Sequence, residues 1–178
     1  NSGGNAVKYY PSLASATSDL SNQSSTNITT LKLLENITET GAVNIYYPVT
    51  IDGDGKTITI KNNYGIKIRS STSTSIIIKN IRISCSSQYT TNLITAQDPS
   101  TQYTSLQLID CILRNGGSGN CIYANNIAGL KTDLEINSQN TLTSNGTVIY
   151  ASNVSALFLQ NSAITSTAGS SAVSISNC

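Results

Sequence analysis

Two pairs of carboxylates in this 178-residue chain are spaced two residues apart, a spacing that could support metal binding or acid–base chemistry. Asp52 and Asp54 lie in the segment DGDGK, whereas Asp133 and Glu135 lie in the segment TDLEI. Glycoside hydrolysis uses two carboxyl groups held about 5 to 10 Å apart, which Asp133 and Glu135 would satisfy on one side of a strand. Their apolar neighbours would then face inward. We therefore interpret this pair as part of a solvated outer face, with an acid pair as the alternative.

The segment Asp52–Lys56 fits neither of two metal- or phosphate-binding loop patterns. A phosphate-binding loop needs a glycine at position 50, where the chain has Thr50. A calcium loop of the EF-hand type needs an oxygen ligand where Lys56 stands. Asp and Gly are turn residues, so the segment predicts a tight turn. A loose calcium contact from Asp52 and Asp54 is the alternative, and we expect no other metal or cofactor.

Nucleophilic catalysis lacks its usual base, because the chain contains no His. The four cysteines form no CxxC pair, and without His they do not complete a zinc site. They are candidates for disulfide bonds, in any of three pairings: Cys85, Cys111, Cys121 and Cys178. For Cys111 and Cys121 the alternative is a buried thiol, and for Cys178 it is a free or intermolecular thiol. We predict no catalytic residue and no enzyme activity.

The elements that position these residues repeat along the chain. Segments 75–83, 105–113, 133–142 and 156–164 match one another, and a polar bend and a second short apolar strand follow each of them. The second strands start 25 to 28 residues apart, at Ile66, Leu93, Cys121, Val148 and Val173. A fixed period of this length is typical of repeat architectures. Two β-rich strands per period, without a helical pattern, predict an all-β parallel solenoid.

In such a solenoid, matched positions stack from coil to coil. The predicted inward positions of the second strands are Ile66, Leu93, Cys121, Val148 and Val173, beside Ile68, Thr95, Tyr123, Tyr150 and Ile175. A further inward ladder is predicted at Ile78, Leu108, Ile136 and Leu159. Where the chain bends, the aligned polar residues are expected to hydrogen-bond between coils: Asn80, Asp110 and Asn161.

The sequence predicts a helix near the N-terminus and a strand at the C-terminus. A helix starting at Pro11 is predicted to place one apolar face, Leu13, Ala16, Thr17 and Leu20, over the open first coil. We divide the chain into an arm with a capping helix (1–26) and the solenoid coils (27–178). The chain reaches Cys178 within a predicted strand. This predicts a truncated fragment, an end covered by a partner, or a subunit that stacks on its neighbour.

The charge composition of the chain argues against nucleic acid and membranes as binding partners. The net charge is +1, charged residues make up 11% of the chain, and no two Lys or Arg residues are adjacent. A nucleic-acid partner or a membrane surface would need a basic face, and insertion would need about 18 consecutive apolar residues, so we expect neither. The chain contains no Met, although it starts at Asn1. We therefore expect a processed or excised chain of exported origin, located outside the cell or on its surface.

Several of these segments resemble a known family. TTLKLLENITET (29–40) and YYPVTIDGDGKTITI (46–60) look like the entry coil of pectin-lyase-like right-handed parallel β-helix proteins, especially the surface and adhesin-like members. The resemblance covers residues 9–178 and implies a right-handed parallel β-helix. The family's polygalacturonase-like enzymes carry Asn-Thr-Asp, Asp-Asp and Gly-His-Gly motifs, and none of these occurs here. Its lyase-like enzymes gather several calcium-binding carboxylates, whereas here they fall on different predicted coils.

The function expected from these observations is non-enzymatic. We predict an extracellular structural stalk or adhesin segment that contacts glycans or cell surfaces. Outward rings for sugar stacking could come from Tyr9, Tyr10, Tyr46, Tyr64, Tyr89 and Tyr103, although for several of them we expect packing in the core or in loops instead. The first alternative is a polysaccharide lyase or hydrolase. The second alternative is a filament subunit that stacks end to end.

Overall fold

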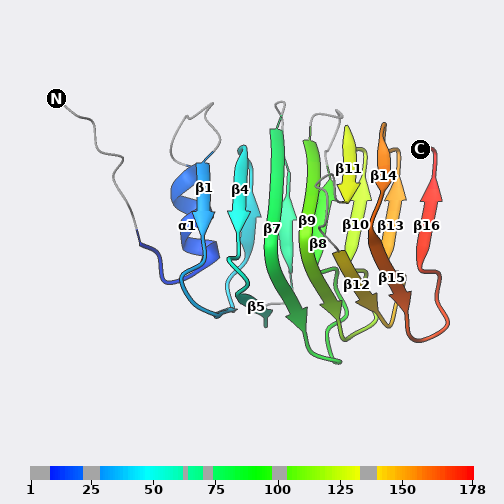
Figure 1. Ribbon diagram of the computed structural model, residues 1–178, viewed down its shortest axis with the longest axis horizontal. Coiled ribbons are helices and arrows are strands. Elements are labelled where there is room, and N and C mark those ends of the chain that lie inside the picture. Colours follow the sequence, from blue (N-terminus) through cyan, green and yellow to red (C-terminus); the bar gives the residue numbers. More distant parts are fainter. Residues whose placement is uncertain (1–8, 22–28, 62–63, 70–73, 98–103, 133–139) are drawn as a thin grey trace.

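The computed structural model describes residues 9–21, 29–61, 64–69, 74–97, 104–132 and 140–178. Parallel strands stack coil upon coil into a β-solenoid, with a short helix near the N-terminus and the C-terminal strand at the opposite end (Figure 1). The predicted all-β solenoid with an N-terminal helix is confirmed. The predicted boundary between residues 26 and 27 lies outside the described residues.

Two sheets form the walls of the solenoid. One path through the ten-stranded sheet runs β1 (Thr29–Lys32), β4 (Val49–Asp52), β7 (Thr74–Cys85), β9 (Thr104–Asn115), β11 (Gly129–Thr132) and β14 (Leu157–Leu159). The same sheet also contains β2 (Ile37–Glu39), β5 (Thr57–Ile60), β12 (Asn140–Ser144) and β15 (Ser162–Ser166). Each coil then adds one strand to the six-stranded sheet: β3 (Val43–Ile45), β6 (Ile66–Ile68), β8 (Ile94–Gln97), β10 (Ile122–Asn125), β13 (Ile149–Ser152) and β16 (Val173–Ser176).

The bends between strand segments use residues that tolerate positive φ. Asn80 and Asp110, which divide the long strands β7 and β9, have φ values of 50° and 52°, and Asn161 has 44°. Asn and Asp adopt this left-handed conformation more readily than most residues because their short side chains hydrogen-bond locally. The predicted turn at DGDGK is confirmed, with positive φ at Asp54 and Gly55.

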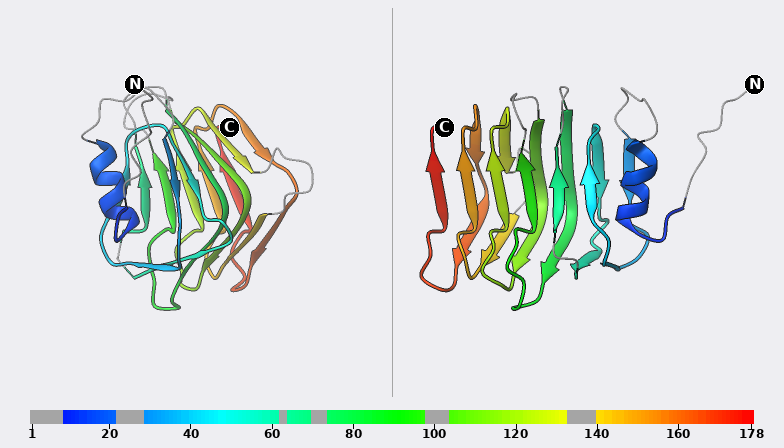
Figure 2. Two further views of the ribbon diagram at one scale, coloured as in Figure 1. Left: turned by 60° about the vertical axis from the view of Figure 1, so that its left-hand side comes forward. Right: turned by 180° about the vertical axis from the view of Figure 1, so that it is seen from behind.

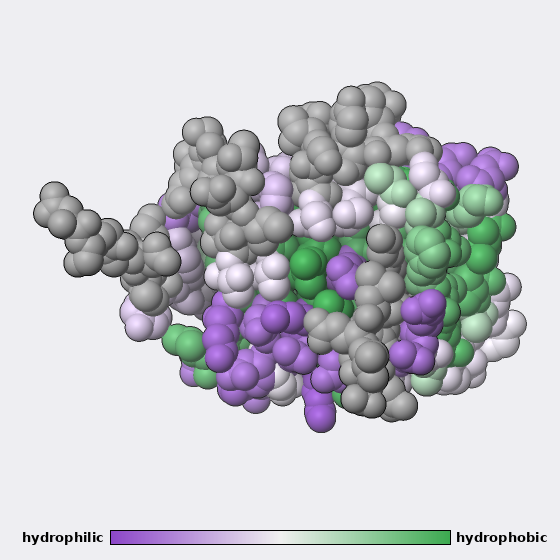
Figure 3. Space-filling view, turned by 45° about the horizontal axis from the view of Figure 1, so that its top comes forward, coloured by the Kyte–Doolittle hydropathy of each residue, from purple (hydrophilic) through white to green (hydrophobic). Residues whose placement is uncertain are grey.

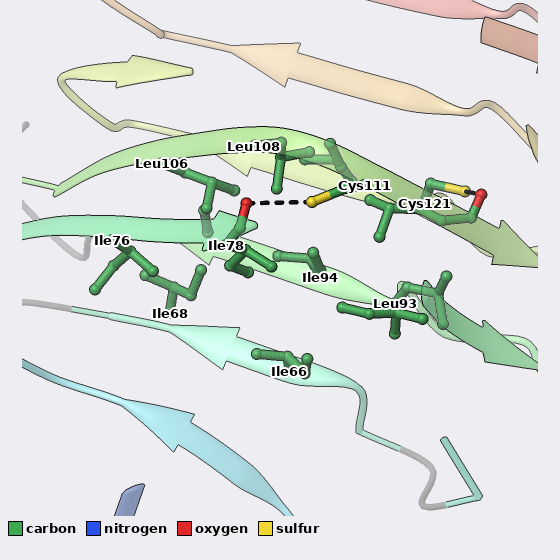
Figure 4. Close-up of a cluster of buried hydrophobic side chains, with 14 of the residues drawn as sticks. Ile66, Ile68, Ile76, Ile78, Leu93, Ile94, Leu106, Leu108, Cys111 and Cys121 are labelled. Atoms are coloured by element: carbon green, nitrogen blue, oxygen red, sulfur yellow. Dashed lines mark hydrogen bonds between the residues drawn. The ribbon is translucent and has the colours of Figure 1, made fainter. Parts of the chain in front are cut away.

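The interior consists of stacked aliphatic side chains (Figure 4). Alternation along each strand sends every second residue inward. In the ten-stranded sheet, Ile76 pairs with Leu106, and Leu106 pairs with Leu130, all three fully buried. The resulting apolar ladders supply the burial free energy that holds the coils together.

The predicted register of the six-stranded sheet was wrong by one residue in its three middle coils, whereas Ile66 and Val173 hold their predicted places. Ile66 pairs with Ile94 rather than Leu93, and the ladder continues through Ile122, Ile149 and Val173. Leu93, Cys121 and Val148 are buried as predicted, but they precede these strands. Beside Ile68 the inward places belong to Ala96, Ala124 and Ala151. The residues between them, Thr95, Tyr123 and Tyr150, therefore face outward.

The strand pairing along the second predicted ladder differs from the prediction at one residue. Ile78 pairs with Leu108 as predicted, but Leu108 pairs next with Thr132, which in turn pairs with Leu159. Ile136, the predicted member, lies outside the described residues. The sequence predicted one strand at 133–142 in this coil. The structure instead has β11, which ends at Thr132, and β12, which begins at Asn140.

The helix α1 (Leu13–Ser21) covers the first coil (Figure 2). It begins two residues after Pro11, and Ser12 accepts a hydrogen bond from the Ser15 N–H at 3.1 Å, as an N-cap does. Leu13, Ala16 and Thr17 are buried, which confirms the predicted apolar face. The Leu13 N–H also donates to Glu39, a buried residue of β2. Within the described ranges no helix is long and apolar enough to cross a membrane.

The opposite end has no such cover in the described structure. Leu157, Leu159, Ile164 and Val173 pack on the core from one side only, and Phe158 and Ile175 are 47% and 54% exposed. Figure 3 shows this end as the apolar region on the right of the molecule. No charged residue follows Glu135 in the sequence.

Candidate binding surface

The outer face of the six-stranded sheet carries one ladder of outward side chains from coil to coil, which we call the tyrosine ladder. Strand alternation and the observed register place its members at Asn44, Lys67, Thr95, Tyr123, Tyr150 and Ser174. Because the strands are parallel and consecutive, these side chains follow one line along the solenoid axis, on a rigid support.

Tyr123 and Tyr150 stack on each other at the centre of the tyrosine ladder. Their ring centroids are 4.9 Å apart and their planes differ by 5°. This separation equals the spacing of about 4.8 Å between neighbouring strands, so the backbone fixes the stack. The remaining ring faces point toward the neighbouring positions, Thr95 on one side and Ser174 on the other. Both neighbours are small, which leaves space for a planar or saturated ring to extend the stack.

A second outward row lies two residues further along the same strands. It consists of the amide and hydroxyl side chains of Gln97, Asn125, Ser152 and Ser176. Ser176 donates to the Ser152 hydroxyl at 2.9 Å. Amides and hydroxyls offer both donors and acceptors, so this row can hydrogen-bond to a ligand that is rich in hydroxyl groups.

Charge differs between the two sheets. Lys67 is the one charged residue in the strands of the six-stranded sheet, and Arg69 follows β6 directly. The Lys67 Nζ lies 4.9 Å from the centroid of the Tyr64 ring, a cation–π contact. On the ten-stranded sheet, by contrast, lysines pair with carboxylates: Lys32 with Asp54 at 3.3 Å and Lys79 with Asp52 at 3.5 Å.

The weak metal candidates Asp52 and Asp54 lie in this ion-paired region. Asp52 accepts hydrogen bonds from the Asp54 N–H at 3.0 Å and the Asn80 side chain at 3.4 Å. Partial burial alone raises the pKa of Asp52, but these hydrogen bonds and the charge of Lys79 lower it below the ordinary value. Across the described ranges no three His, Cys, Asp or Glu side chains cluster as a metal site. Asp133 and Glu135 lie outside these ranges.

Comparison with known proteins gives no family. No family model, no curated protein and no solved structure matches this chain. The parallel β-solenoid is compatible with a parallel β-helix family. The chemistry of the outer surface of the solenoid is therefore the guide to function.

The tyrosines predicted for sugar stacking divide into three groups. Tyr9, Tyr46 and Tyr64 are exposed, as that role requires. Tyr89 is 6% exposed and belongs to the core, which agrees with the core packing expected for several of these rings. Tyr10 donates a hydrogen bond to Asp19 from a partly buried position, and Tyr103 lies outside the described residues. The sequence reasoning missed the outward tyrosines of β10 and β13, whose signal is the repeated Ile-Tyr-Ala triplet.

All four cysteines are free thiols in the structure. The Cys111 Sγ–H donates to the Ile78 carbonyl at 3.1 Å (Figure 4), and the Cys121 Sγ–H donates to the Thr143 carbonyl at 3.0 Å. Burial raises the pKa of both thiols to about 12. Cys85 is partly buried and Cys178 is exposed. A thiol is nucleophilic as its thiolate, so Cys111 and Cys121 are inert core residues in this arrangement.

Proposed function

We propose that this chain is a non-enzymatic extracellular module, a rigid β-solenoid stalk or adhesin segment that contacts glycans. The observation that carries the proposal is the stacked pair Tyr123 and Tyr150 between the small residues Thr95 and Ser174. The tyrosine ladder and the polar row beside it form the contact surface.

The chemistry of this surface fits an extended carbohydrate. Aromatic rings provide rigid apolar contact area and hydroxyl groups on the same side chain. The neighbouring amides and hydroxyls match the hydroxyls of a sugar ring. The ladder runs along the solenoid, so a polymer lying along the axis would contact several coils at once, and each coil would add binding free energy.

Retention on immobilised polysaccharides and host glycans tests the proposal. We expect retention of the intact chain and about a tenfold loss with the double variant Tyr123→Ser, Tyr150→Ser, because aromatic contacts contribute about 0.5–1.5 kcal/mol each. Phe158→Ser is the matched control and should retain binding, since Phe158 is an exposed aromatic residue that lies in β14 of the ten-stranded sheet. Absence of retention on every glycan would contradict the proposal.

The same incubations address the enzymatic alternative. Released fragments that increase with protein concentration would identify a polysaccharide lyase or hydrolase. The proposal of a non-enzymatic module would then be wrong. Retention without released fragments supports binding alone.

A second candidate function, self-association, is favoured by the apolar end formed by β14, β15 and β16. This end has exposed Phe158 and Ile175 and no charged side chain that would repel a second copy. The helix α1 occupies the opposite end. End-to-end contact between two chains would therefore join two β16 ends and produce a dimer, whereas the filament alternative would need an uncovered first coil.

A further inference from the structure

Within the described residues, the outer face of the six-stranded sheet has cations but no acid. None of the chain's nine Asp and Glu residues lies in the six strands, whereas Lys67 lies in β6 and Arg69 follows it. Neither cation has an ion pair with a carboxylate in the described part of the chain. Lys79 and Lys32, on the other sheet, are both paired. Arg82 and Arg114 on the ten-stranded sheet are also exposed, but the face with the tyrosine ladder is the one that combines stacked aromatic rings with cations and has no acid in its strands.

We infer that the glycan bound by this face is anionic, a polysaccharide that carries carboxylate or sulfate groups. This inference rests on the proposed function and adds the chemical class of the ligand. Sugar rings contact the free faces of Tyr123 and Tyr150, and an acid group further along the same polymer pairs with Lys67 and Arg69. A neutral polymer would leave both cations unpaired.

The spacing of the two contact points supports one continuous ligand. Lys67 lies in β6 and Tyr123 in β10, and β8 separates them, so they are two strand spacings, or about 10 Å, apart along the axis. Both side chains point outward from the same sheet. The Tyr64 ring beneath Nζ holds the Lys67 ammonium group in place without neutralising it. A polymer along the axis can reach both points without crossing the carboxylates of the other sheet.

Two polymers with the same backbone test the inference: carboxymethyl cellulose, which is anionic, and hydroxyethyl cellulose, which is neutral. Affinity electrophoresis of the whole chain would measure binding to each polymer at low and high salt. We expect at least tenfold tighter binding to the anionic polymer, with the difference lost at high salt because ions screen exposed charges. Dextran sulfate against dextran would show whether sulfate serves as well as carboxylate.

Paired variants locate the site. Lys67→Gln with Arg69→Gln should remove the preference for the anionic polymer and leave binding to the neutral one unchanged. Arg82→Gln with Arg114→Gln removes the same charge from exposed positions on the ten-stranded sheet and should retain the preference. Circular dichroism would confirm that each variant is folded.

The outcomes separate this inference from the proposed function. Equal binding of neutral and anionic polymers, or a preference that persists without Lys67 and Arg69, would overturn the anionic assignment and leave glycan binding standing. A preference that disappears only with Arg82 and Arg114 would overturn it as well, because the site would then lie on the other sheet. Absence of binding to these polymers and to the wider glycan panel would overturn both.

Discussion

Among the described glycines, Gly117 has the least room for a side chain, because a neighbouring coil passes directly beside it. A Cβ atom at this position would lie 1.5 Å from the Tyr89 carbonyl oxygen. The Gly117 N–H also donates to the Asn115 side chain at 3.0 Å, so the backbone cannot move away without losing this bond. Neighbouring coils therefore meet here through backbone atoms alone.

Gly117→Ala should lower the free energy of unfolding by about 1–3 kcal/mol or more, because overpacking forces backbone shifts. Urea denaturation would measure the change. Gly129→Ala is the matched control, since its Cβ would have its nearest neighbour at 3.5 Å, an ordinary contact. Equal stability of the two variants would contradict the predicted clash.

The buried thiols predict how stability depends on pH. The pKa of Cys111 and Cys121 is raised from 9.0 to about 12 by burial. Between these values the unfolded chain loses protons that the folded chain keeps, so the free energy of unfolding falls as the pH rises. We expect a decrease of up to about 1.4 kcal/mol per pH unit for each thiol.

Urea denaturation at pH 8 and pH 10 would measure this decrease. The double variant Cys111→Ala, Cys121→Ala should be less stable at pH 8, because it leaves cavities, but should lose less stability on going to pH 10. An unchanged pH dependence in this variant would show that other groups cause the decrease.

At the scale of elements, a single buried side chain attaches α1 to the first coil. Glu39 in β2 is fully buried, and its Oε1 accepts the hydrogen bond of the Leu13 N–H at the start of the helix. Its second oxygen, Oε2, has no hydrogen-bond partner. The contact therefore ties the helix to the first coil through one side chain.

Glu39→Ala should destabilise α1 by about 1–2 kcal/mol, because it removes an acceptor from the helix N-terminus and leaves a buried N–H unpaired. Hydrogen exchange of the α1 amides would detect this as faster exchange. Glu39→Gln keeps an acceptor oxygen and should behave more like the original chain, and the exposed Glu35→Ala serves as a control. Normal protection of α1 in Glu39→Ala would contradict the role of this bond.

The sequence predicts the elements better than their register. The helix face, the DGDGK turn and the bends at Asn80 and Asp110 follow from local residue preferences. The register of the six-stranded sheet does not, because β8, β10 and β13 are each preceded by another buried residue, as Leu93 precedes Ile94. With two consecutive buried residues, either one can be taken as the first inward position of the strand, and the two choices place opposite side chains on the outer face.

This one-residue error hid the candidate site. With Leu93 aligned to Ile66, the tyrosines of β10 and β13 appear to face the core. The repeated alanines, Ala96, Ala124 and Ala151, resolve the ambiguity, because a narrow interior accepts a small residue where a tyrosine would not fit.

At the scale of the whole molecule, the two ends of the solenoid predict different behaviour. The apolar end at β14, β15 and β16 should pair with a second copy at high protein concentration, because unpaired strand edges without charged residues invite pairing. Ile175→Lys should weaken this self-association at least about tenfold, since two like charges brought together at an interface cost several kcal/mol.

Sedimentation velocity over a range of concentrations would measure the association. Ile112→Lys is the matched control, because Ile112 is also exposed but lies in the middle of the ten-stranded sheet. A monomer at every concentration, or equal weakening by both variants, would contradict pairing through the β16 end.

The orientation of the strand ladders also has a mechanical consequence. Consecutive coils are joined by parallel ladders, whose hydrogen bonds run along the solenoid axis. A tensile force between α1 and β16 would load these ladders one after another, so the outermost coil would peel off first. A coil spans 27 residues between Ile122 and Ile149, and its release would add about 90 Å of extended chain. Under load the solenoid would therefore lengthen stepwise, coil by coil, and absorb work at each step.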